Sequence, residues 1–130
     1  MAEVASCCCG QLTVACEGEP VRRSICHCLE CQRRTGSVFG FQARYSRDAV
    51  TISGRATEYV RGSDDGGKVA LSFCPNCGST VYWKLEALPG FISVAVGAFA
   101  DPQFPPPLVS VYEERKHPWV TTPKSVRHID

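Results

Sequence analysis

The arrangement of cysteine sets the first limit on this chain. Nine of its 130 residues are cysteine, and eight of these lie in three short clusters, at residues 7–9, 26–31 and 74–77. Such a load predicts disulfides in a secreted protein, but metal or redox chemistry in an intracellular one. The odd number, the C-x-C and C-x-x-C spacings, and an N-terminus that does not resemble a signal peptide all favour metal.

These clusters would bind metal through thiolates. A C-x-x-C pair turns two sulfurs toward one ion, and Gly10 and Gly78, which directly follow cysteines, permit the left-handed backbone that completes such a turn. Thiolate is a soft donor, and zinc prefers four ligands in a tetrahedron. Four cysteines would therefore close one structural zinc site. Three more would form a second site with a vacant position, as in catalytic zinc centres.

The spacing leaves the pairing of the clusters open. A zinc ribbon would join Cys28 and Cys31 to Cys74 and Cys77, although the gap between these pairs exceeds the roughly 15–20 residues of the common ribbon pattern. The alternative joins the first cluster to the third. It leaves Cys26, Cys28 and Cys31 as a three-thiolate site.

Short strands separated by turns are predicted over most of the chain, which favours a single domain, residues 1–130, built as a β-sandwich or open barrel. The predicted strands are residues 11–17, 38–45, 49–53, 57–61, 68–73, 79–84 and 91–96. Residues 29–34, stopped by Gly36, predict a helical turn. Residues 101–107 contain four prolines and predict a surface connection rather than a strand.

The charges nearly cancel, with 14 Lys and Arg against 13 Asp and Glu. This balance gives no basic surface for nucleic acid or for an anionic membrane. The longest apolar run, residues 91–100, is too short to span a bilayer. We therefore expect a cytoplasmic protein with no nucleic-acid or membrane partner.

The cysteine clusters and their neighbours resemble the signature of the glutathione-dependent formaldehyde-activating enzyme family, which also includes centromere protein V. The matching motifs are Cys7-x-Cys9-Gly10, Cys26-His27-Cys28-x-x-Cys31, Arg33-x-Thr35-Gly36, Phe73-Cys74-x-x-Cys77-Gly78-Ser79 and Lys116-x-Pro118-Trp119. They occur in the expected order and cover nearly the whole chain. The resemblance implies a mainly β fold, an Mss4-like zinc-binding β-sandwich of short antiparallel strands.

The resemblance also implies two zinc sites and a reaction. The closed structural site would consist of Cys7, Cys9, Cys74 and Cys77. The open, catalytic site would consist of Cys26, Cys28 and Cys31. The implied activity is that of a carbon–sulfur lyase, which joins glutathione as co-substrate to formaldehyde or a related aldehyde, or cleaves the adduct.

Glutathione carries two carboxylates, and Arg33 and Arg34 directly follow the open cluster, so they are candidates to bind them. A solvated basic pair is the alternative reading. His27 lies between two predicted ligands, so its side chain should point away from the metal and support the site rather than transfer protons. His128, close to the C-terminus, is expected to be disordered.

Two cysteines remain outside the predicted sites. Cys16 shares a strand face with Leu12 and Val14, and this pattern predicts that its thiol is buried among apolar side chains. Cys8 lies between two predicted ligands, so we expect its thiol to point away from their metal and to remain unbound. The alternative function is a non-catalytic Mss4-like zinc module that binds glutathione or a protein partner, and a pure scaffold would need only the closed site.

Overall fold

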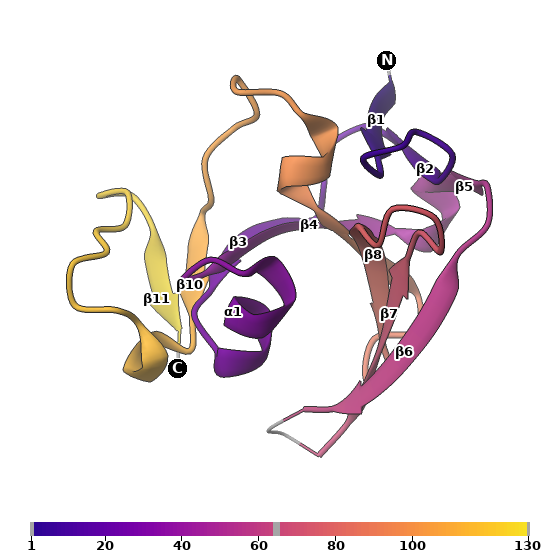
Figure 1. Cartoon of the computed structure of the whole chain (residues 1–130). Coiled ribbons are helices and arrows are strands. Elements are labelled where there is room, and N and C mark those ends of the chain that lie inside the picture. The colour runs from indigo at the N-terminus through magenta and orange to yellow at the C-terminus, as the bar shows by residue number, and fades with distance from the viewer. Residues whose placement is uncertain (1, 64–65, 130) are drawn as a thin grey trace.

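The chain forms two β-sheets and one short helix in a computed structural model that describes residues 2–63 and 66–129 (Figure 1). The smaller sheet has the strand order β1 (Ala2–Ser6), β2 (Thr13–Glu17) and β5 (Val50–Ser53). The larger sheet has the order β11 (Arg127–Ile129), β10 (Val109–Val111), β3 (Arg22–Cys26), β4 (Gly40–Ser46), β9 (Phe91–Ala95), β8 (Thr80–Leu85), β7 (Lys68–Phe73) and β6 (Thr57–Gly62).

The helical elements occur at connections between strands. Helix α1 (Leu29–Thr35) follows β3, and it ends at Gly36, which adopts a left-handed φ of 70°. Three single turns of 3-10 helix are η1 (Arg47–Ala49), η2 (Val96–Phe99) and η3 (Glu113–Arg115). No helix within the described residues has the length and apolar character that crossing a membrane requires.

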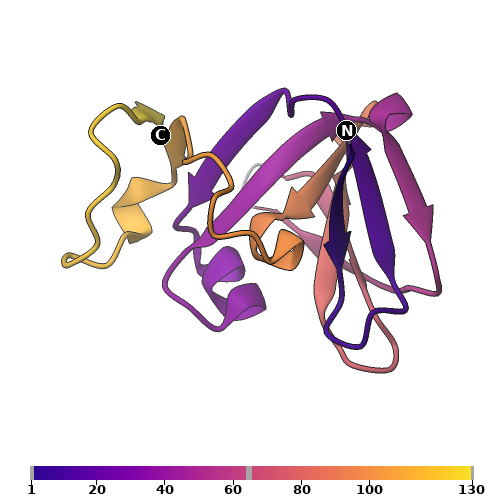
Figure 2. The same ribbon diagram turned by 90° about the horizontal axis from the view of Figure 1, so that it is seen from above.

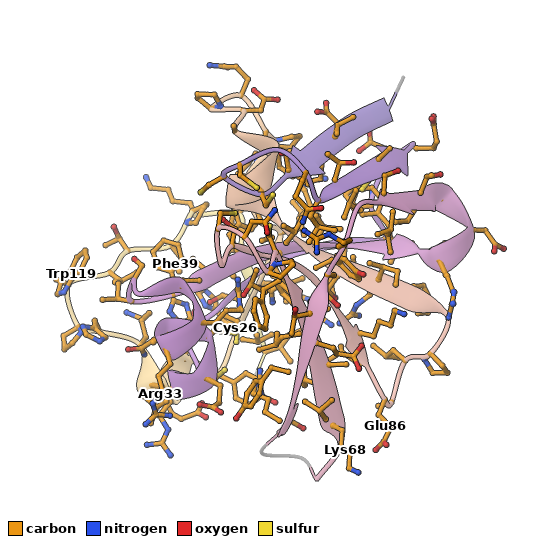
Figure 3. All side chains as sticks on the ribbon, turned by 45° about the vertical axis from the view of Figure 1, so that its right-hand side comes forward. Cys26, Arg33, Phe39, Lys68, Glu86 and Trp119 are labelled. Atoms are coloured by element: carbon orange, nitrogen blue, oxygen red, sulfur yellow. The ribbon has the colours of Figure 1, made fainter. Side chains whose placement is uncertain are left out.

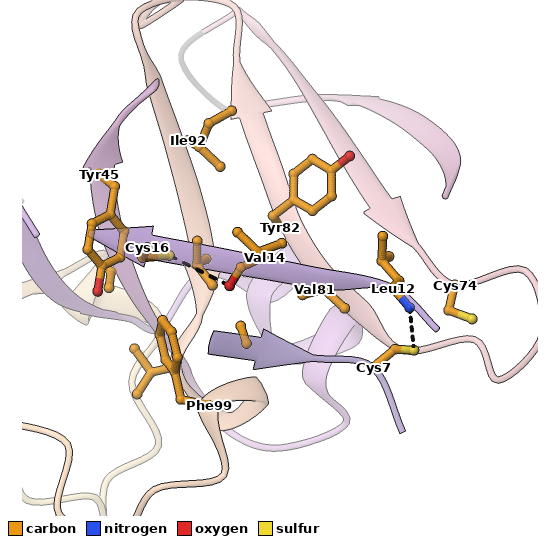
Figure 4. Packing of buried hydrophobic residues seen from close by; sticks show 14 residues of the cluster. Cys7, Leu12, Val14, Cys16, Tyr45, Cys74, Val81, Tyr82, Ile92 and Phe99 are labelled. Carbon is orange, nitrogen blue, oxygen red and sulfur yellow. Dashed lines mark hydrogen bonds between the residues drawn. The ribbon is translucent and has the colours of Figure 1, made fainter. Parts of the chain in front are cut away.

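The main hydrophobic core lies between the two sheets (Figures 2 and 4). Strand β2 contributes Val14 and Cys16, and β4 contributes Ala43 and Tyr45 from the facing sheet. Because successive strand residues point to opposite faces, Arg44, which lies between the two core residues of β4, is on the other side of the larger sheet. That second face carries polar side chains and forms the wall of a cleft.

The mainly β prediction is confirmed, and the predicted strand over residues 68–73 coincides with β7. The other six predicted strands match β2, β4, β5, β6, β8 and β9 within a few residues. The predicted helical turn is α1, and residues 101–107 contain no strand. The predicted hairpin tip after β6 includes Asp64 and Asp65, which lie outside the described residues.

Four strands were not predicted: β1, β3, β10 and β11. Strand β10 pairs in parallel with both β3 and β11, whereas the other pairings are antiparallel. The expectation that His128 is disordered was wrong, because it lies in β11 opposite Ser110. Its Nδ1 atom lies 2.7 Å from the Glu113 carboxylate, which anchors the strand.

Candidate metal centres

Two turns that are distant in sequence bring four cysteines together. Cys7 and Cys9 lie in the turn between β1 and β2, and Cys74 and Cys77 lie in the turn between β7 and β8. The Sγ atoms of Cys7 and Cys9 are 3.7 Å apart, and those of Cys9 and Cys74 are 3.6 Å apart. All four sulfurs lie within 4.8 Å of one another, so this cluster can hold a metal ion. We call it the four-cysteine cluster.

The two turns have related backbone hydrogen bonds. In the first, the N–H of Gly10 donates to the carbonyl of Cys7 at 3.1 Å. In the second, the N–H of Gly78 donates to the carbonyl of Cys74 at 2.8 Å. Gly10 and Gly78 have φ values of 86° and 82°, which side-chain-bearing residues rarely adopt. The predicted role of these glycines in completing each turn is confirmed.

Hydrogen bonds to the sulfurs favour the thiolate form. The backbone N–H groups of Leu12 and Asn76 donate to Cys7 Sγ and Cys74 Sγ, each at 3.3 Å (the first is drawn in Figure 4). Gln11 Nε2 donates to Cys74 Sγ at 3.0 Å. The Ser79 hydroxyl lowers the pKa of Cys77 to about 5. The sequence did not predict the hydrogen bond from Gln11 to Cys74, because no spacing rule identifies a side chain in one turn that donates to a sulfur in the other.

A second cluster forms where β3 passes into α1. Cys26 is the last residue of β3, Cys28 is the N-cap of α1, and Cys31 is the buried residue of that helix. Their sulfurs lie within 4.8 Å of one another and can also hold a metal ion. We call this the three-cysteine cluster. The sequence left two pairings open. The structure joins the first cysteine cluster of the sequence to the third and leaves these three cysteines as a separate group.

The three sulfurs share protons unequally. Hydrogen bonds from the thiols of Cys26 and Cys31 lower the pKa of Cys28, and the N–H of Cys31 donates to the same sulfur at 3.3 Å. The hydrogen bond between Cys26 and Cys28 raises the pKa of Cys26. Cys28 is therefore the thiol that ionises first. All nine cysteines lie within the described residues and are free rather than disulfide-bonded.

The three-cysteine cluster lies on the wall of a cleft of about 340 Å³. Figure 3 shows Cys26 in the interior of the molecule and Lys68 toward the far end of the sheet. The cleft covers the polar face of the larger sheet, and its floor includes the buried ring of Trp83. A volume of this size falls within the usual range for small-molecule sites. Trp119, by contrast, is 71% exposed and does not line it.

The two candidate arginines lie in different environments. Arg33 is exposed at the outer face of α1, where it forms an ion pair of 2.9 Å with Glu30 (Figure 3). Arg34 stacks its guanidinium on Trp83, 4.2 Å from the ring centroid, and burial lowers its pKa. Neither residue lines the cleft, although Arg34 lines a neighbouring groove beside Phe39 and Phe41. Their contact with glutathione remains a prediction.

His27 faces away from the three-cysteine cluster, toward β10. It is fully buried, and its Nε2 atom lies 3.0 Å from Ser110 Oγ. The Ser110 hydroxyl donates to Glu113 Oε2 at 2.6 Å, so it accepts the hydrogen of His27 Nε2. Burial also lowers the pKa of His27. These contacts fit the predicted supporting position of this residue beside the cluster.

The two remaining cysteines lie where the sequence predicted them. Cys16 is fully buried in the core, and burial raises the pKa of its thiol to about 11. Cys8 is exposed and belongs to neither cluster, although its backbone N–H donates to Ser79 Oγ.

Comparison with known proteins gives a family and a fold. The family model described as glutathione-dependent formaldehyde-activating enzyme matches residues 3–115. A crystal structure of a Rhodobacter sphaeroides protein, a target of the Northeast Structural Genomics programme, has a TM-score of 0.59 and 20% sequence identity to this chain. The match covers 79% of this chain and 91% of that one, and it supports the predicted Mss4-like β-sandwich. No curated protein matches the chain significantly.

Proposed function

The chain belongs to the glutathione-dependent formaldehyde-activating enzyme family, and from this membership we propose that it is a zinc-dependent carbon–sulfur lyase. It would join the thiol of glutathione to formaldehyde or a related aldehyde, or cleave the adduct. The observation that carries the proposal is the three-cysteine cluster, which lies on the wall of a cleft and is separate from a complete set of four thiols.

The four-cysteine cluster fits zinc as a structural site. Zinc–sulfur distances of about 2.3 Å place the corners of a tetrahedron about 3.8 Å apart. The sulfur separations of 3.7 Å between Cys7 and Cys9 and 3.6 Å between Cys9 and Cys74 are close to that value. The N–H groups that point at the sulfurs of Cys7 and Cys74 would stabilise bound thiolates. In this proposal, zinc here contributes to folding rather than to the reaction.

The three-cysteine cluster fits zinc with one coordination position left for a substrate. Zinc held by three thiolates would keep a fourth thiol, that of glutathione, ionised at neutral pH. Cys28, whose pKa is already lowered, is the residue of the cluster best prepared to bind metal. Because three thiolates and one divalent ion carry a net negative charge, we favour delivery of the thiolate over activation of the aldehyde.

The proposed reaction adds sulfur to a carbonyl carbon. The carbon–sulfur bond forms, the electron pair of the C=O double bond moves to oxygen, and that oxygen takes up the proton released by the thiol. His27 is not among the residues that line the cleft and hydrogen-bonds to Ser110 instead, so the proposal gives it no part in moving this proton. The cleft therefore contributes by holding the thiol near the cluster and by orienting the rest of glutathione.

Magnetisation-exchange NMR on an equilibrium mixture of formaldehyde, glutathione and their adduct tests this proposal. Zinc-loaded protein should accelerate exchange beyond the uncatalysed rate, and the Cys28→Ser variant should not. If neither protein accelerates exchange, the lyase assignment is wrong. The chain would then be a non-catalytic zinc module that binds glutathione or a protein partner.

We also propose that the protein is a single zinc-binding domain that works in the cytoplasm on small molecules. Its nine free thiols suit a reducing compartment. Arg33 and Arg34 stay candidates for the glutathione carboxylates. Of the two, Arg34 is closer to the cluster, since it contacts Cys31.

A further inference from the structure

The cleft beside the three-cysteine cluster is lined by four cationic side chains and one acidic one among the described residues. The cations are Arg22, Arg44, Arg61 and Lys68, and the acid is Glu30. Glu30 already forms an ion pair with Arg33 on the outer surface of α1. The chain as a whole has a formal net charge of only +1, so this accumulation is local. It marks the cleft as a site for an anion.

Arg22 and Arg44 are the two cleft cations that bury a nitrogen atom without a hydrogen-bond partner. They face each other as cross-strand partners on β3 and β4. The Nε atoms of both are buried and have no hydrogen-bond partner, and neither guanidinium forms an ion pair within the described residues. Burial and, next, the charge of Arg22 lower the pKa of Arg44.

Such an arrangement is unfavourable for the chain alone. Like charges directly opposite each other on a sheet are destabilising, and buried charges are normally paired. Long arginine side chains at the edge of a fold can avoid this by extending into water. Here both side chains are only partly exposed and line the cleft with their Nε atoms buried, so an anion bound in the cleft would supply a negative charge beside them.

The register places this pair on the same face as the metal-binding end of β3. Arg22, Ser24 and Cys26 alternate along the strand, so all three point into the cleft. Arg44 lies opposite Ser93 on the next strand, and Ser93 lies opposite Trp83, which continues the row across the cleft floor. The pair and the cluster are therefore two ends of one surface.

The separation suits a short peptide-like ligand. Four residues along an extended strand correspond to about 13 Å between the Cα atoms of Arg22 and Cys26. A tripeptide spans at most about 10 Å, and an arginine side chain reaches well beyond its own Cα atom. A ligand whose sulfur lies at the cluster can thus present a carboxylate to the arginines.

We propose that Arg22 and Arg44 form a carboxylate-binding subsite that orients the thiol substrate, with its carboxylate at the arginines and its sulfur at the three-cysteine cluster. The inference rests on the proposed function for the identity of the thiol as glutathione. It adds that the site selects thiols carrying a carboxylate over neutral thiols of similar size. Paired guanidinium groups suit this task because each offers two parallel donors to a carboxylate.

Isothermal titration calorimetry with glutathione and with its diethyl ester, in which both carboxylates are blocked, tests the subsite. The zinc-loaded protein should bind glutathione roughly ten- to a hundredfold more tightly than the ester, as expected for charge-assisted hydrogen bonds. The Arg22→Gln/Arg44→Gln variant should lose most of this preference by weakening glutathione binding while leaving ester binding unchanged. Equal affinity of the unmodified protein for both ligands, or for glutathione before and after substitution, would overturn the proposal.

Two further variants control the comparison. Arg47→Gln/Arg127→Gln removes the same charge from two exposed arginines outside the cleft, and it should leave both affinities unchanged. Arg22→Lys/Arg44→Lys keeps both positive charges and should retain a preference for glutathione over the ester. If the glutamine variant fails to fold, this variant still tests the subsite, because loss of the preference in it would contradict the proposal. The melting temperature of the glutamine variant should not fall, because the repulsion between the two cations is removed.

The same proteins in the exchange experiment separate this inference from the proposed function. Carboxylate-dependent binding without accelerated exchange would leave the subsite standing and remove the lyase assignment. The opposite outcome is exchange that both the unmodified protein and the Arg22→Gln/Arg44→Gln variant accelerate equally at low glutathione concentration. That result would support the lyase assignment and overturn the carboxylate subsite.

Discussion

The Sγ atoms of Cys9 and Cys74 lie 3.6 Å apart, although the two residues are 65 positions apart in sequence. This contact joins a turn of the smaller sheet to a turn of the larger one. A metal ion bound there would hold the two sheets together at one end of the core. The other cluster joins a strand to the helix that directly follows it, so it connects much less of the fold.

The Cys74→Ser variant should therefore lose both one metal ion and much of its stability. Serine does not replace thiolate as a zinc ligand, and structural zinc contributes directly to folding. We expect the melting temperature to fall by more than about 10 °C, measured by circular dichroism, with metal content measured on the same sample. Cys8→Ser is the matched control because Cys8 is exposed and outside the cluster, and it should leave both values unchanged.

The Cys28→Ser variant should remain folded but bind one metal ion fewer. Its sulfur caps α1 through the N–H of Cys31, and a serine hydroxyl is a good substitute in that role. Circular dichroism and metal analysis would check this. If Cys28→Ser and Cys74→Ser unfold the protein equally, the division into a structural and an open site is wrong.

Alkaline pH should destabilise the protein through Cys16. Its pKa is raised from 9.0 to about 11 in the folded state, so the stabilisation is fully present below pH 9 and is lost as pH rises through 11. At pH 10.5 the loss amounts to up to about 2 kcal/mol. Urea unfolding at pH 8 and pH 10.5 should show a smaller decrease for Cys16→Ala than for the unmodified protein. An equal decrease would contradict the assignment.

The Ser110→Ala variant should lose stability without losing metal. Removal of the hydroxyl leaves the buried His27 Nε2–H without its acceptor, which costs about 1–3 kcal/mol. Denaturant unfolding and metal analysis measure the two effects separately. Ser37→Ala, at an exposed serine, should change stability by less than about 0.5 kcal/mol. A parallel loss of metal would show that metal binding depends on the contact between His27 and Ser110.

The Gly40→Ala variant should disturb the surroundings of the three-cysteine cluster. An added methyl group would lie 2.6 Å from Arg34 Nη2 and 3.5 Å from the Cβ atom of Cys31, so the Arg34 side chain must move. We expect the protein to fold and to accelerate adduct exchange several-fold less than the unmodified protein. Gly97→Ala is the control, because its methyl group meets no atom within 4 Å. Full activity of Gly40→Ala would show that the position of Arg34 does not matter.

The fold was predictable where the strands carry a regular apolar pattern. Strand β7 alternates between less buried and buried positions over residues 68–71, and the sequence predicts its correct ends. Strand β3 was missed because its cleft-facing residues, Arg22, Ser24 and Cys26, are polar, so it lacks the apolar alternation of a half-buried strand. Strands β10 and β11 have three residues each, too few for a periodic signal.

The candidate site was predictable where its residues follow one another closely in sequence. The C-x-C and C-x-x-C spacings pick out all seven cysteines of the two clusters as candidate metal ligands. The spacing could not decide how the clusters pair, because that depends on which turns the sheets bring together. For the same reason, Arg33 and Arg34 were chosen for their proximity in sequence. Arg22 and Arg44, which line the cleft, became visible only through the pairing of β3 with β4.

The long sequence separation within the four-cysteine cluster also has a consequence for how the protein is made. During synthesis, Cys7 and Cys9 emerge from the ribosome long before Cys74 and Cys77. At translation rates of about 5–20 residues per second, the delay is roughly 4 to 14 s. For that time the first two thiols lack the two partners that they have in the folded structure, and they are open to oxidation and to competing metal ions. If this cluster takes a metal ion as proposed, the order of translation makes its capture a late event, one that depends on the redox state of the nascent chain.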